Sequence, residues 1–427
     1  MGDAELKPRR LRGHTATATC CIASRERHGV IVTAGEDGCI CWFDLRCKDA
    51  QLIIDVGNEP VTSLCLKSGN EDIVYASSGK EVKSFDVRMG ASWKALECYN
   101  YNKEEIDQIA CNTKSSFLAC ADDGGDVKVC RFMNSVIWFF LGRHYLCHYF
   151  VPLTLLNRSA VLCNSFLGNL GKLVGITAHR RCCYSLPLSQ HIIGLIYSVI
   201  LFEIISLWVI AVITGGLDSK LVMWDFSKGR PLKIIDFGLP DMNSSNTGQC
   251  YNPAFVHAIA VPDVDMLDKT DKICVVARGD GVIDVVNIES ELSTIRSKNS
   301  TKAWKGSQSI PKDNPLAGEM ETLDLNGGKR LHLDYSLGGH TAAASCVAFS
   351  LFGEKGKYII SGGNDKSVKV WDCSRFPRTG QTGTNSDLLH MNINLNRKVN
   401  WLCTSPTESE NLVVCDTSKV VKVYTIS

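Results

Sequence analysis

Two histidines in the chain are each followed by an aspartate at nearly the same distance. His14 lies 23 residues before Asp37, and His340 lies 25 residues before Asp365. A histidine oriented by a carboxylate is the combination used in general acid–base catalysis, and a nearby hydroxyl would add a nucleophile. The residue pattern around the two pairs decides between that chemistry and a structural role.

Both pairs lie in copies of one repeated pattern. In TAGEDGCICWFD (33–44), TGGLDSKLVMWD (214–225) and SGGNDKSVKVWD (361–372), a turn aspartate precedes a final aspartate by seven positions. Weaker copies are ASSGKEVKSFD, ADDGGDVKVC, ARGDGVIDVVN and DTSKVVKVYT. Each copy predicts strand, tight turn and strand, because Gly, Asp and Asn tolerate positive φ and the alternation that follows suits a half-buried strand.

The Gly-His, turn-Asp and Trp-Asp spacing of residues 339–372 resembles the WD-repeat β-propeller family, in which each repeat supplies one four-stranded blade. The resemblance implies an all-β, seven-bladed propeller. We expect the segment before Gly13 to supply the outer strand of the last blade, since closing the ring removes exposed sheet edges.

In that family the histidine, the turn aspartate, a hydroxyl residue and the tryptophan form a hydrogen-bonded set inside a blade. The resemblance therefore implies a structural role for these residues, with no catalytic residue among them. Carried over here, they are His340, Asp365, Ser361 and Trp371 in the sixth repeat, His14, Asp37, Thr33 and either Trp42 or Phe43 in the first, and Asp218 and Trp224 in the fourth.

The repeat period divides the chain into three parts. Residues 1–130 are expected to form blades 1–3, and residues 213–427 the rest of blade 4 and blades 5–7. A polar, aperiodic stretch at about 291–335 is expected to be a disordered loop. Residues 131–212 separate the two parts as a hydrophobic insert that interrupts blade 4.

The insert contains one acidic residue, Glu203, and lacks a recognisable opening strand for blade 4. Three interpretations stay open. It is a translated non-coding stretch from a retained intron or a faulty gene model, a membrane hairpin, or a buried insert. Residues 191–213 are apolar enough to cross a bilayer. A single span, however, would place the two parts of the ring on opposite sides of the membrane.

Composition and motifs favour a binding protein over an enzyme. The 46 basic and 45 acidic residues leave a net charge of +1, which does not indicate a nucleic-acid partner. None of the 20 cysteines forms a C-x-x-C motif, so no metal site is predicted. No G-x-S-x-G motif or Walker-type loop is present. We expect no cofactor.

Several stretches, among them NKEEIDQIACNTKSSFLACADDGGDVKV (102–129) and GQCYNPAFVHAIAV (248–261), resemble the WD repeat-containing protein 53 family, and a plant member is expected. Two blades end in aromatic-Asp-x-Arg, at Asp44 and Arg46 and at Asp86 and Arg88. These ends resemble the motif by which WD-repeat substrate receptors dock on the damaged-DNA-binding adaptor of cullin ubiquitin ligases.

The resemblance implies a monomeric protein-interaction scaffold in the cytoplasm, the nucleus or both. A substrate receptor of a cullin-RING ligase and a general scaffold with no ligase link remain the alternatives. A membrane location, through residues 191–213, is expected only if the insert is a genuine part of the protein.

Overall fold

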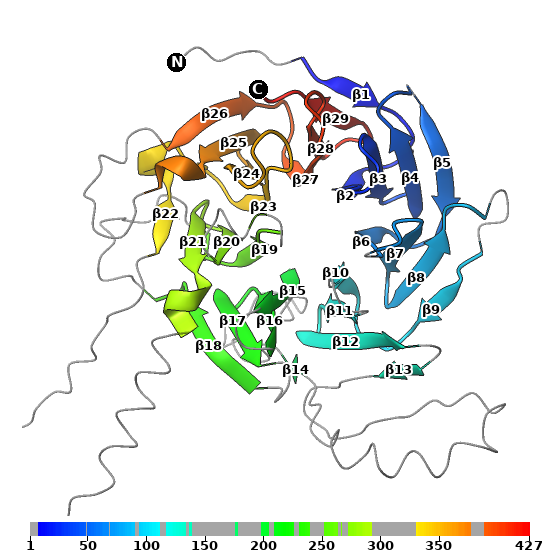
Figure 1. Ribbon diagram of the computed structural model, residues 1–427, viewed down its shortest axis with the longest axis horizontal. Coiled ribbons are helices and arrows are strands. Elements are labelled where there is room, and N and C mark those ends of the chain that lie inside the picture. Colours follow the sequence, from blue (N-terminus) through cyan, green and yellow to red (C-terminus); the bar gives the residue numbers. More distant parts are fainter. Residues whose placement is uncertain are drawn as a thin grey trace, which may run out of the picture.

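Seven antiparallel sheets, six of four strands and one of five, stand around a central axis in the computed structural model, and this confirms the seven-bladed propeller (Figure 1). The blades are numbered here in chain order of their inner strands. The structure describes residues 7–47, 49–67, 69–89, 94–111, 117–133, 136–138, 176–177, 198–204, 209–225, 230–239, 252–263, 266, 272–292, 330–376 and 388–427.

Blades 1–3 take their strands in sequence order from the inside of the ring outward. The strands are β2 (Ala18–Ala23), β3 (Val30–Gly35), β4 (Cys39–Asp44) and β5 (Ala50–Asp55) in blade 1; β6 (Val61–Leu66), β7 (Ile73–Ser78), β8 (Glu81–Asp86) and β9 (Glu97–Tyr99) in blade 2; and β10 (Ile106–Cys111), β11 (Phe117–Asp122), β12 (Asp126–Met133) and β13 (Val136–Trp138) in blade 3, where β14 (Ile176–Thr177) also pairs with β12.

The same order continues through blades 4–7. The strands are β15 (Ser198–Ile204), β16 (Val209–Gly215), β17 (Lys220–Asp225) and β18 (Arg230–Asp236) in blade 4; β19 (Val256–Ala260), β20 (Ile273–Arg278), β21 (Ile283–Asn287) and β22 (Leu331–Leu333) in blade 5; β23 (Ala344–Phe349), β24 (Tyr358–Gly363), β25 (Ser367–Asp372) and β26 (Leu389–Asn394) in blade 6; and β27 (Val399–Thr404), β28 (Leu412–Asp416), β29 (Val421–Tyr424) and β1 (Arg9–Leu11) in blade 7. Two 3₁₀ turns, η3 (Tyr335–Leu337) and η4 (Cys373–Arg375), follow β22 and β25.

In blades 1–6 the hairpin between the second and third strands contains a left-handed residue. In blade 1 this residue is Gly38, with φ of 70°, and a Cβ on it would lie 2.0 Å from the Gly57 carbonyl oxygen. In blades 4 and 6 the same turn position holds Ser219 and Lys366, with φ of 59° and 63°. Non-glycine residues rarely adopt this conformation, so the rest of each hairpin must hold the turn in place.

The two ends of the chain close the ring. The N-terminal strand β1 pairs with β29, with Arg9 opposite Val423 and Leu11 opposite Val421, and thereby forms the outer strand of blade 7. Figure 1 shows β1 beside β29. Leu11 is buried and packs into the cluster between blades 7 and 1. Pairing through the terminal strand covers an edge of β29 that would otherwise be open.

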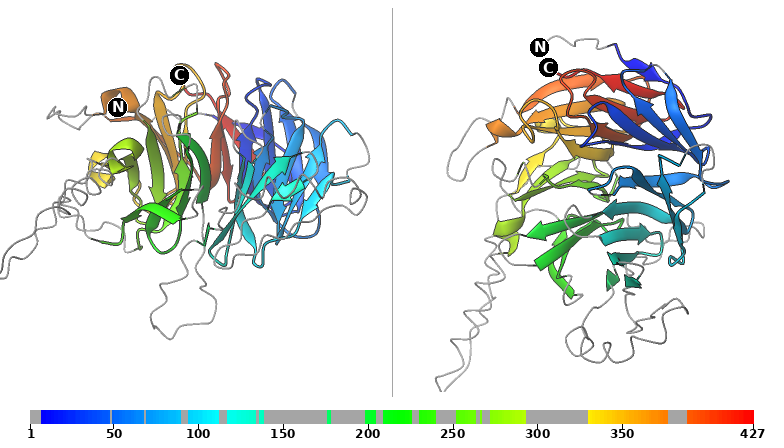
Figure 2. Two further views of the ribbon diagram at one scale, coloured as in Figure 1. Left: turned by 60° about the horizontal axis from the view of Figure 1, so that its bottom comes forward. Right: turned by 45° about the vertical axis from the view of Figure 1, so that its right-hand side comes forward.

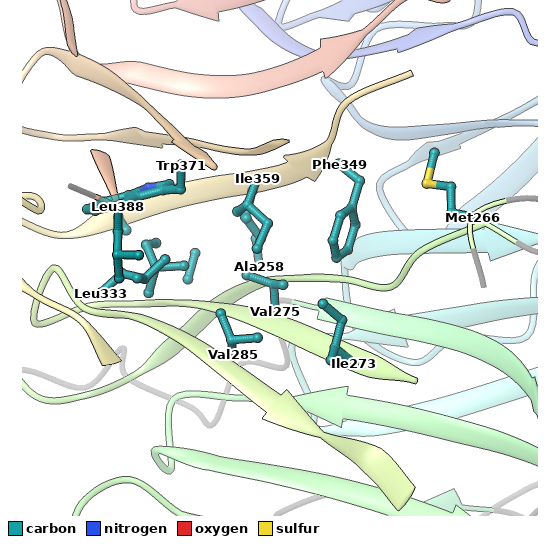
Figure 3. Packing of buried hydrophobic residues seen from close by; sticks show 14 residues of the cluster. Ala258, Met266, Ile273, Val275, Val285, Leu333, Phe349, Ile359, Trp371 and Leu388 are labelled. Atoms are coloured by element: carbon teal, nitrogen blue, oxygen red, sulfur yellow. The ribbon is translucent and has the colours of Figure 1, made fainter. Parts of the chain in front are cut away.

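Apolar side chains fill the spaces between neighbouring blades, which stand close together in all three ribbon views (Figures 1 and 2). In the cluster between blades 5 and 6, Trp371 and Leu388 lie over Leu333, and Ile359 lies over Val275 (Figure 3). All five side chains are buried. The flat faces of the sheets, which are hydrophobic on both sides, therefore form the core.

A β-bulge recurs at one position of six inner strands and leaves an extra residue there. In five blades this side chain donates to a carbonyl of the next inner strand. The bonds run from Thr19 to Val61 (2.6 Å), Thr62 to Ile106 (2.5 Å), His257 to Ala344 (2.9 Å), Ser345 to Val399 (2.7 Å) and Asn400 to Ala18 (3.1 Å). The sixth residue is Asp107; in blade 4 the equivalent position precedes β15, outside the described residues.

The structure corrects the expectation that residues 131–212 stand apart from the propeller. The strand β13 is the outer strand of blade 3, β15 is the inner strand of blade 4, and β16 begins at Val209. The sequence SVILFEI is rich in β-branched residues and pairs in register with β16 from Ser198 to Ile204. Hydropathy alone does not separate two consecutive buried strands from one apolar helix. The remaining residues of 131–212 lie outside the described ones.

The membrane alternative for residues 191–213 is wrong where the structure describes them, because residues 198–204 and 209–213 are strands of blade 4. Within the described ranges, no helix is long and apolar enough to cross a bilayer. The predicted loop at 291–335 is also wrong at its end. The segment LHL forms β22 and pairs with β21, and Tyr335 begins η3. Blade 5 obtains its fourth strand in this way.

Candidate functional site

The predicted polar residues of the sixth repeat meet inside blade 6. His340 Nδ1 lies 3.0 Å from Asp365 Oδ1, and His340 Nε2 lies 2.9 Å from Ser361 Oγ. The indole N–H of Trp371 donates to the same Ser361 oxygen at 3.1 Å. One proton arrangement satisfies the whole chain, with Trp371 donating to Ser361, Ser361 to His340, and His340 to Asp365.

Burial and hydrogen bonds around Asp365 act on its pKa in opposite directions. Burial raises the pKa of this carboxyl, but the hydrogen bond and electrostatic attraction of His340, followed by the Ser367 hydroxyl and the Thr341 N–H, outweigh it and lower the pKa to about 2. The His340 side chain is completely buried. A Cβ on Gly363 would lie 2.5 Å from His340 Nδ1, so only glycine leaves room for the ring.

Blade 1 contains the same set with one difference. His14 Nδ1 lies 3.1 Å from Asp37 Oδ1, and His14 Nε2 lies 2.8 Å from Thr33 Oγ1. Phe43 pairs with Ile31 in the register in which Trp371 pairs with Ile359, so Phe43 is the equivalent aromatic residue and Trp42 is not. Since a phenyl ring has no N–H, the blade 1 set lacks the aromatic donor.

In blade 4 the structure describes the tryptophan, the hydroxyl residue and the turn aspartate of the set. The Trp224 indole donates to Thr214 Oγ1 at 2.9 Å, and Asp218 accepts from the Lys220 N–H at 3.2 Å. The segment that would carry a histidine before β15 lies outside the described residues.

Blades 3, 5 and 7 use an ion pair across the same hairpin, which the sequence analysis missed. In blade 3, Lys128 Nζ lies 3.7 Å from Asp122 Oδ2 and donates to the Tyr101 carbonyl at 2.5 Å, and Asn102 donates to Asp122 at 2.9 Å. Both charged side chains are almost fully buried. Burial raises the pKa of Asp122 even though Asn102 and Lys128 favour its charged form.

The other two blades show the same geometry. Lys422 bonds to Asp416 in blade 7, and in blade 5 the order is reversed, with Arg278 Nη1 donating to Asp284 Oδ2 at 2.6 Å. His332 of the outer strand also contacts Asp284. Each pair is six residues apart in sequence and lies on a strand diagonal, where side chains share a face of the sheet. An acidic and a basic residue six positions apart across the turn of a weaker repeat copy are therefore the sequence signal that could have predicted these ion pairs.

The His–Asp sets and the ion pairs therefore have a structural role inside single blades. In blades 1 and 6 a glycine leaves space that the His–Asp pair fills, and in blades 3 and 7 an aspartate occupies that strand position and takes a lysine partner. Across the described parts of the chain, no three His, Cys, Asp or Glu side chains are grouped as metal ligands would be.

The two predicted docking arginines have the same geometry on neighbouring blades. Arg46 Nε and Nη2 donate to Asp44 at 2.9 and 2.6 Å, and Arg88 Nε and Nη2 donate to Asp86 at the same two distances. The side chains remain 82% and 62% exposed. The hydrogen bond from Arg88 lowers the pKa of Asp86 to about 2, and that from Arg46 lowers the pKa of Asp44.

A third arginine joins the two blades at this face. Arg27 of the β2–β3 loop bonds to Asp72 of the β6–β7 loop, and Arg88 Nε lies 3.4 Å from the other oxygen of Asp72. The Arg27 guanidinium also lies over the Trp42 ring, 5.7 Å from its centroid. We call Arg27, Arg46 and Arg88 the arginine patch.

The fold and the repeats define the class of protein. Residues 7–44 and 332–372 match the WD40 family, "WD domain, G-beta repeat". The chain is a seven-bladed β-propeller that contains WD40 repeats in these two segments. Propellers built from WD40 repeats typically serve as non-enzymatic scaffolds for other proteins.

Among proteins, the chain is similar to the WD repeat-containing protein 53 homolog of Dictyostelium discoideum, at 23% identity over 98% of this chain and 94% of that protein. Among solved structures, it is similar to the WD40 β-propeller domain of Doa1, with a TM-score of 0.57 and 11% identity over 99% of this chain and 98% of that one. It is also similar to the computationally designed Ika8 protein, with a TM-score of 0.51 and 16% identity over 98% of this chain and all of that one. These two likenesses concern the fold alone.

Proposed function

We propose that the chain is a substrate receptor that docks on the damaged-DNA-binding adaptor of a cullin-RING ubiquitin ligase through Arg46 and Arg88. The observation that carries the proposal is the repetition of one exposed Asp–Arg geometry at the end of the third strand of two adjacent blades. Equivalent strands of adjacent blades end on the same face of a propeller, so both guanidinium groups face one partner.

The aspartates orient the arginines without using all of their donors. Asp44 and Asp86 each bind Nε and Nη2, which leaves Nη1 and the outer hydrogen of Nη2 available for a partner. An arginine held in advance loses less side-chain entropy on binding than a free one. An acidic or carbonyl-rich surface is the complementary partner.

The segment that carries Arg88 also exposes apolar side chains, as a docking surface would. Met89 is 61% exposed and Leu96 is 47% exposed, both on the connection between β8 and β9. The Leu96 N–H donates to the Ser84 carbonyl at 2.8 Å, which holds Leu96 against the edge of β8. Arginine together with exposed apolar residues is typical of protein-interface hot spots.

The test is binding of the purified adaptor by the wild type, Arg46→Ala, Arg88→Ala and the double variant. Each single variant should weaken binding about 30-fold, which corresponds to about 2 kcal/mol, and the double variant should abolish it. Arg375→Ala is the matched control, because Arg375 also pairs with a blade-ending aspartate, Asp372 at 3.2 Å, but on blade 6. It should bind like the wild type.

Full binding by the double variant would remove the arginines from the interface. No binding by the wild type would leave the alternative function, a general protein-interaction scaffold without a ligase link. For either function we propose a monomer that acts in the cytoplasm or the nucleus. The closure of the ring by the chain's own terminal strand β1 supports the monomer.

A further inference from the structure

Two cysteines face each other across the seam between blades 2 and 3. Cys65 lies on the inner strand β6 and Cys111 ends the inner strand β10, and their Sγ atoms are 3.2 Å apart. A disulfide has a sulfur–sulfur distance of about 2.05 Å, so closing the bond requires each sulfur to move by roughly half an ångström. Side-chain rotation supplies a movement of that size without a shift of the strands.

The backbone fixes this pairing independently of the thiol rotamers. The Thr62 hydroxyl donates to the Ile106 carbonyl at 2.5 Å, and the Ile109 N–H donates to the Ser63 hydroxyl at 3.2 Å. Residues 63 and 109 are thus neighbours across the seam, and two residues further along each strand the side chains point the same way. That step leads to Cys65 and Cys111.

Exposure distinguishes this pair from the buried pair Cys21 and Cys415. Both Cys65 and Cys111 are partly exposed, whereas Cys21 and Cys415, which lie together between blades 1 and 7, are buried. Burial and the neighbouring Cys111 raise the pKa of Cys65, so the Cys65 thiol is protonated at neutral pH and reacts slowly by itself. We therefore assign the first reaction with a small oxidant to Cys111.

We infer that Cys65 and Cys111 are a redox modification site, at which a peroxide converts the two thiols into a reversible disulfide that joins blades 2 and 3. The Cys111 thiolate attacks one peroxide oxygen, which forms the sulfenic acid and releases hydroxide. The Cys65 sulfur then attacks the Cys111 sulfur, the new S–S bond forms, and the hydroxyl leaves as water. The two thiols lose two electrons and two protons, and hydrogen peroxide becomes two waters.

The bond would tie together two inner strands that are 46 residues apart in sequence. Closing a loop of this length constrains the unfolded chain, so the oxidised protein should melt on the order of 4 °C higher than the reduced protein. The disulfide would also fix blade 2, which carries Arg88, against blade 3.

The experiment treats the purified full-length chain with hydrogen peroxide, blocks the remaining thiols with iodoacetamide after denaturation, and maps the cysteines by mass spectrometry. We expect a peptide pair linked through Cys65 and Cys111 that dithiothreitol separates, with Cys21 and Cys415 recovered as alkylated thiols. In Cys111→Ser the linked pair and the rise in melting temperature should both disappear.

Recovery of Cys65 and Cys111 as separate alkylated or sulfinic residues, with no linked pair, would overturn the inference. The linked peptide is sought in the wild-type protein, so this outcome does not depend on the folding of a variant. A linked pair between Cys21 and Cys415 in place of the predicted one would equally overturn it, because exposure would then not select the site.

Discussion

The substitution Asp365→Ala removes the carboxylate that holds the buried histidine of blade 6. Asp365 accepts hydrogen bonds from His340 Nδ1 at 3.0 Å, from the Thr341 N–H at 3.1 Å and from the Ser367 hydroxyl at 2.8 Å. The His340 ring is completely buried, so water does not replace the lost acceptor at Nδ1. An unsatisfied buried donor costs about 1–3 kcal/mol.

The Thr341 N–H and the Ser367 hydroxyl determine where in this range of about 1–3 kcal/mol the cost of Asp365→Ala falls. Thr341 is exposed, so water replaces the bond to its N–H. The Ser367 hydroxyl lies 3.3 Å from His340 Nδ1 and can accept from it once the carboxylate is gone. We therefore expect a loss of about 2 kcal/mol in the free energy of unfolding, which for a chain of this length is a fall in melting temperature of about 2 °C.

Equilibrium urea denaturation measures this change more sharply than melting does. Asn364→Ala is the matched control, because it alters the preceding residue of the same turn and should change stability by less than about 0.5 kcal/mol. If Asp365→Ala changes stability no more than the control does, the carboxylate is only a surface turn residue and the buried-network argument is refuted.

The pH dependence supplies a second check. The folded pKa of Asp365 is about 2, below its ordinary value of 3.8, so the folded state binds the proton less readily than the unfolded state. The stabilisation is therefore fully present above pH 3.8 and is lost as the pH falls toward 2. The difference in stability between the wild type and Asp365→Ala should shrink over that interval; a constant difference would contradict the assignment.

Two further predictions concern the blade 3 ion pair and the closure of the ring. Lys128→Ala should destabilise the chain by about 3–5 kcal/mol, since it leaves the buried Asp122 carboxylate without its cation, and Lys128→Met combined with Asp122→Asn should recover part of that loss in urea denaturation. A loss below about 1 kcal/mol for Lys128→Ala would show that the pair is solvated. Deletion of residues 1–12 removes β1 and uncovers the edge of β29, so size-exclusion chromatography should show aggregation that deletion of residues 1–6 does not cause, and a monodisperse 1–12 deletion would contradict the closure.

The fold could be predicted from the sequence because the residues that form each hairpin are close together along the chain. A turn aspartate, a left-handed turn position and alternating residues such as those of SGGNDKSVKVWD lie within about a dozen positions of one another, and the hydrogen bonds that they specify are equally local. Counting such copies predicted seven blades, and the structure confirms that number. The spacing of His340 and Asp365 also placed them in one blade, where the structure finds them in contact.

Blade 4 shows where local patterns fail. The run from residue 191 to residue 213 left a membrane span open as an alternative, because average hydropathy does not tell whether an apolar segment packs in a lipid bilayer or against a neighbouring strand. Ser198–Ile204 pairs with Val209–Gly215, and β15 lies between blades 3 and 5 as the inner strand of blade 4. These two contacts show that the residues are strands of the propeller. The position of β15 depends on the closure of the entire ring.

The sequence by itself determined the repeat, the number of blades and the residues of each hairpin turn, because all of these depend on neighbours close along the chain. Only the tertiary structure decided which groups meet across a seam or at a closure. Cys65 reaches Cys111, Arg27 reaches Asp72, and Arg9 of the first strand lies opposite Val423 of the last. The partners in these contacts are separated by between 45 and more than 400 residues. They meet because seven twisted sheets must pack face to face and return to the first, a condition that no short segment of the chain encodes.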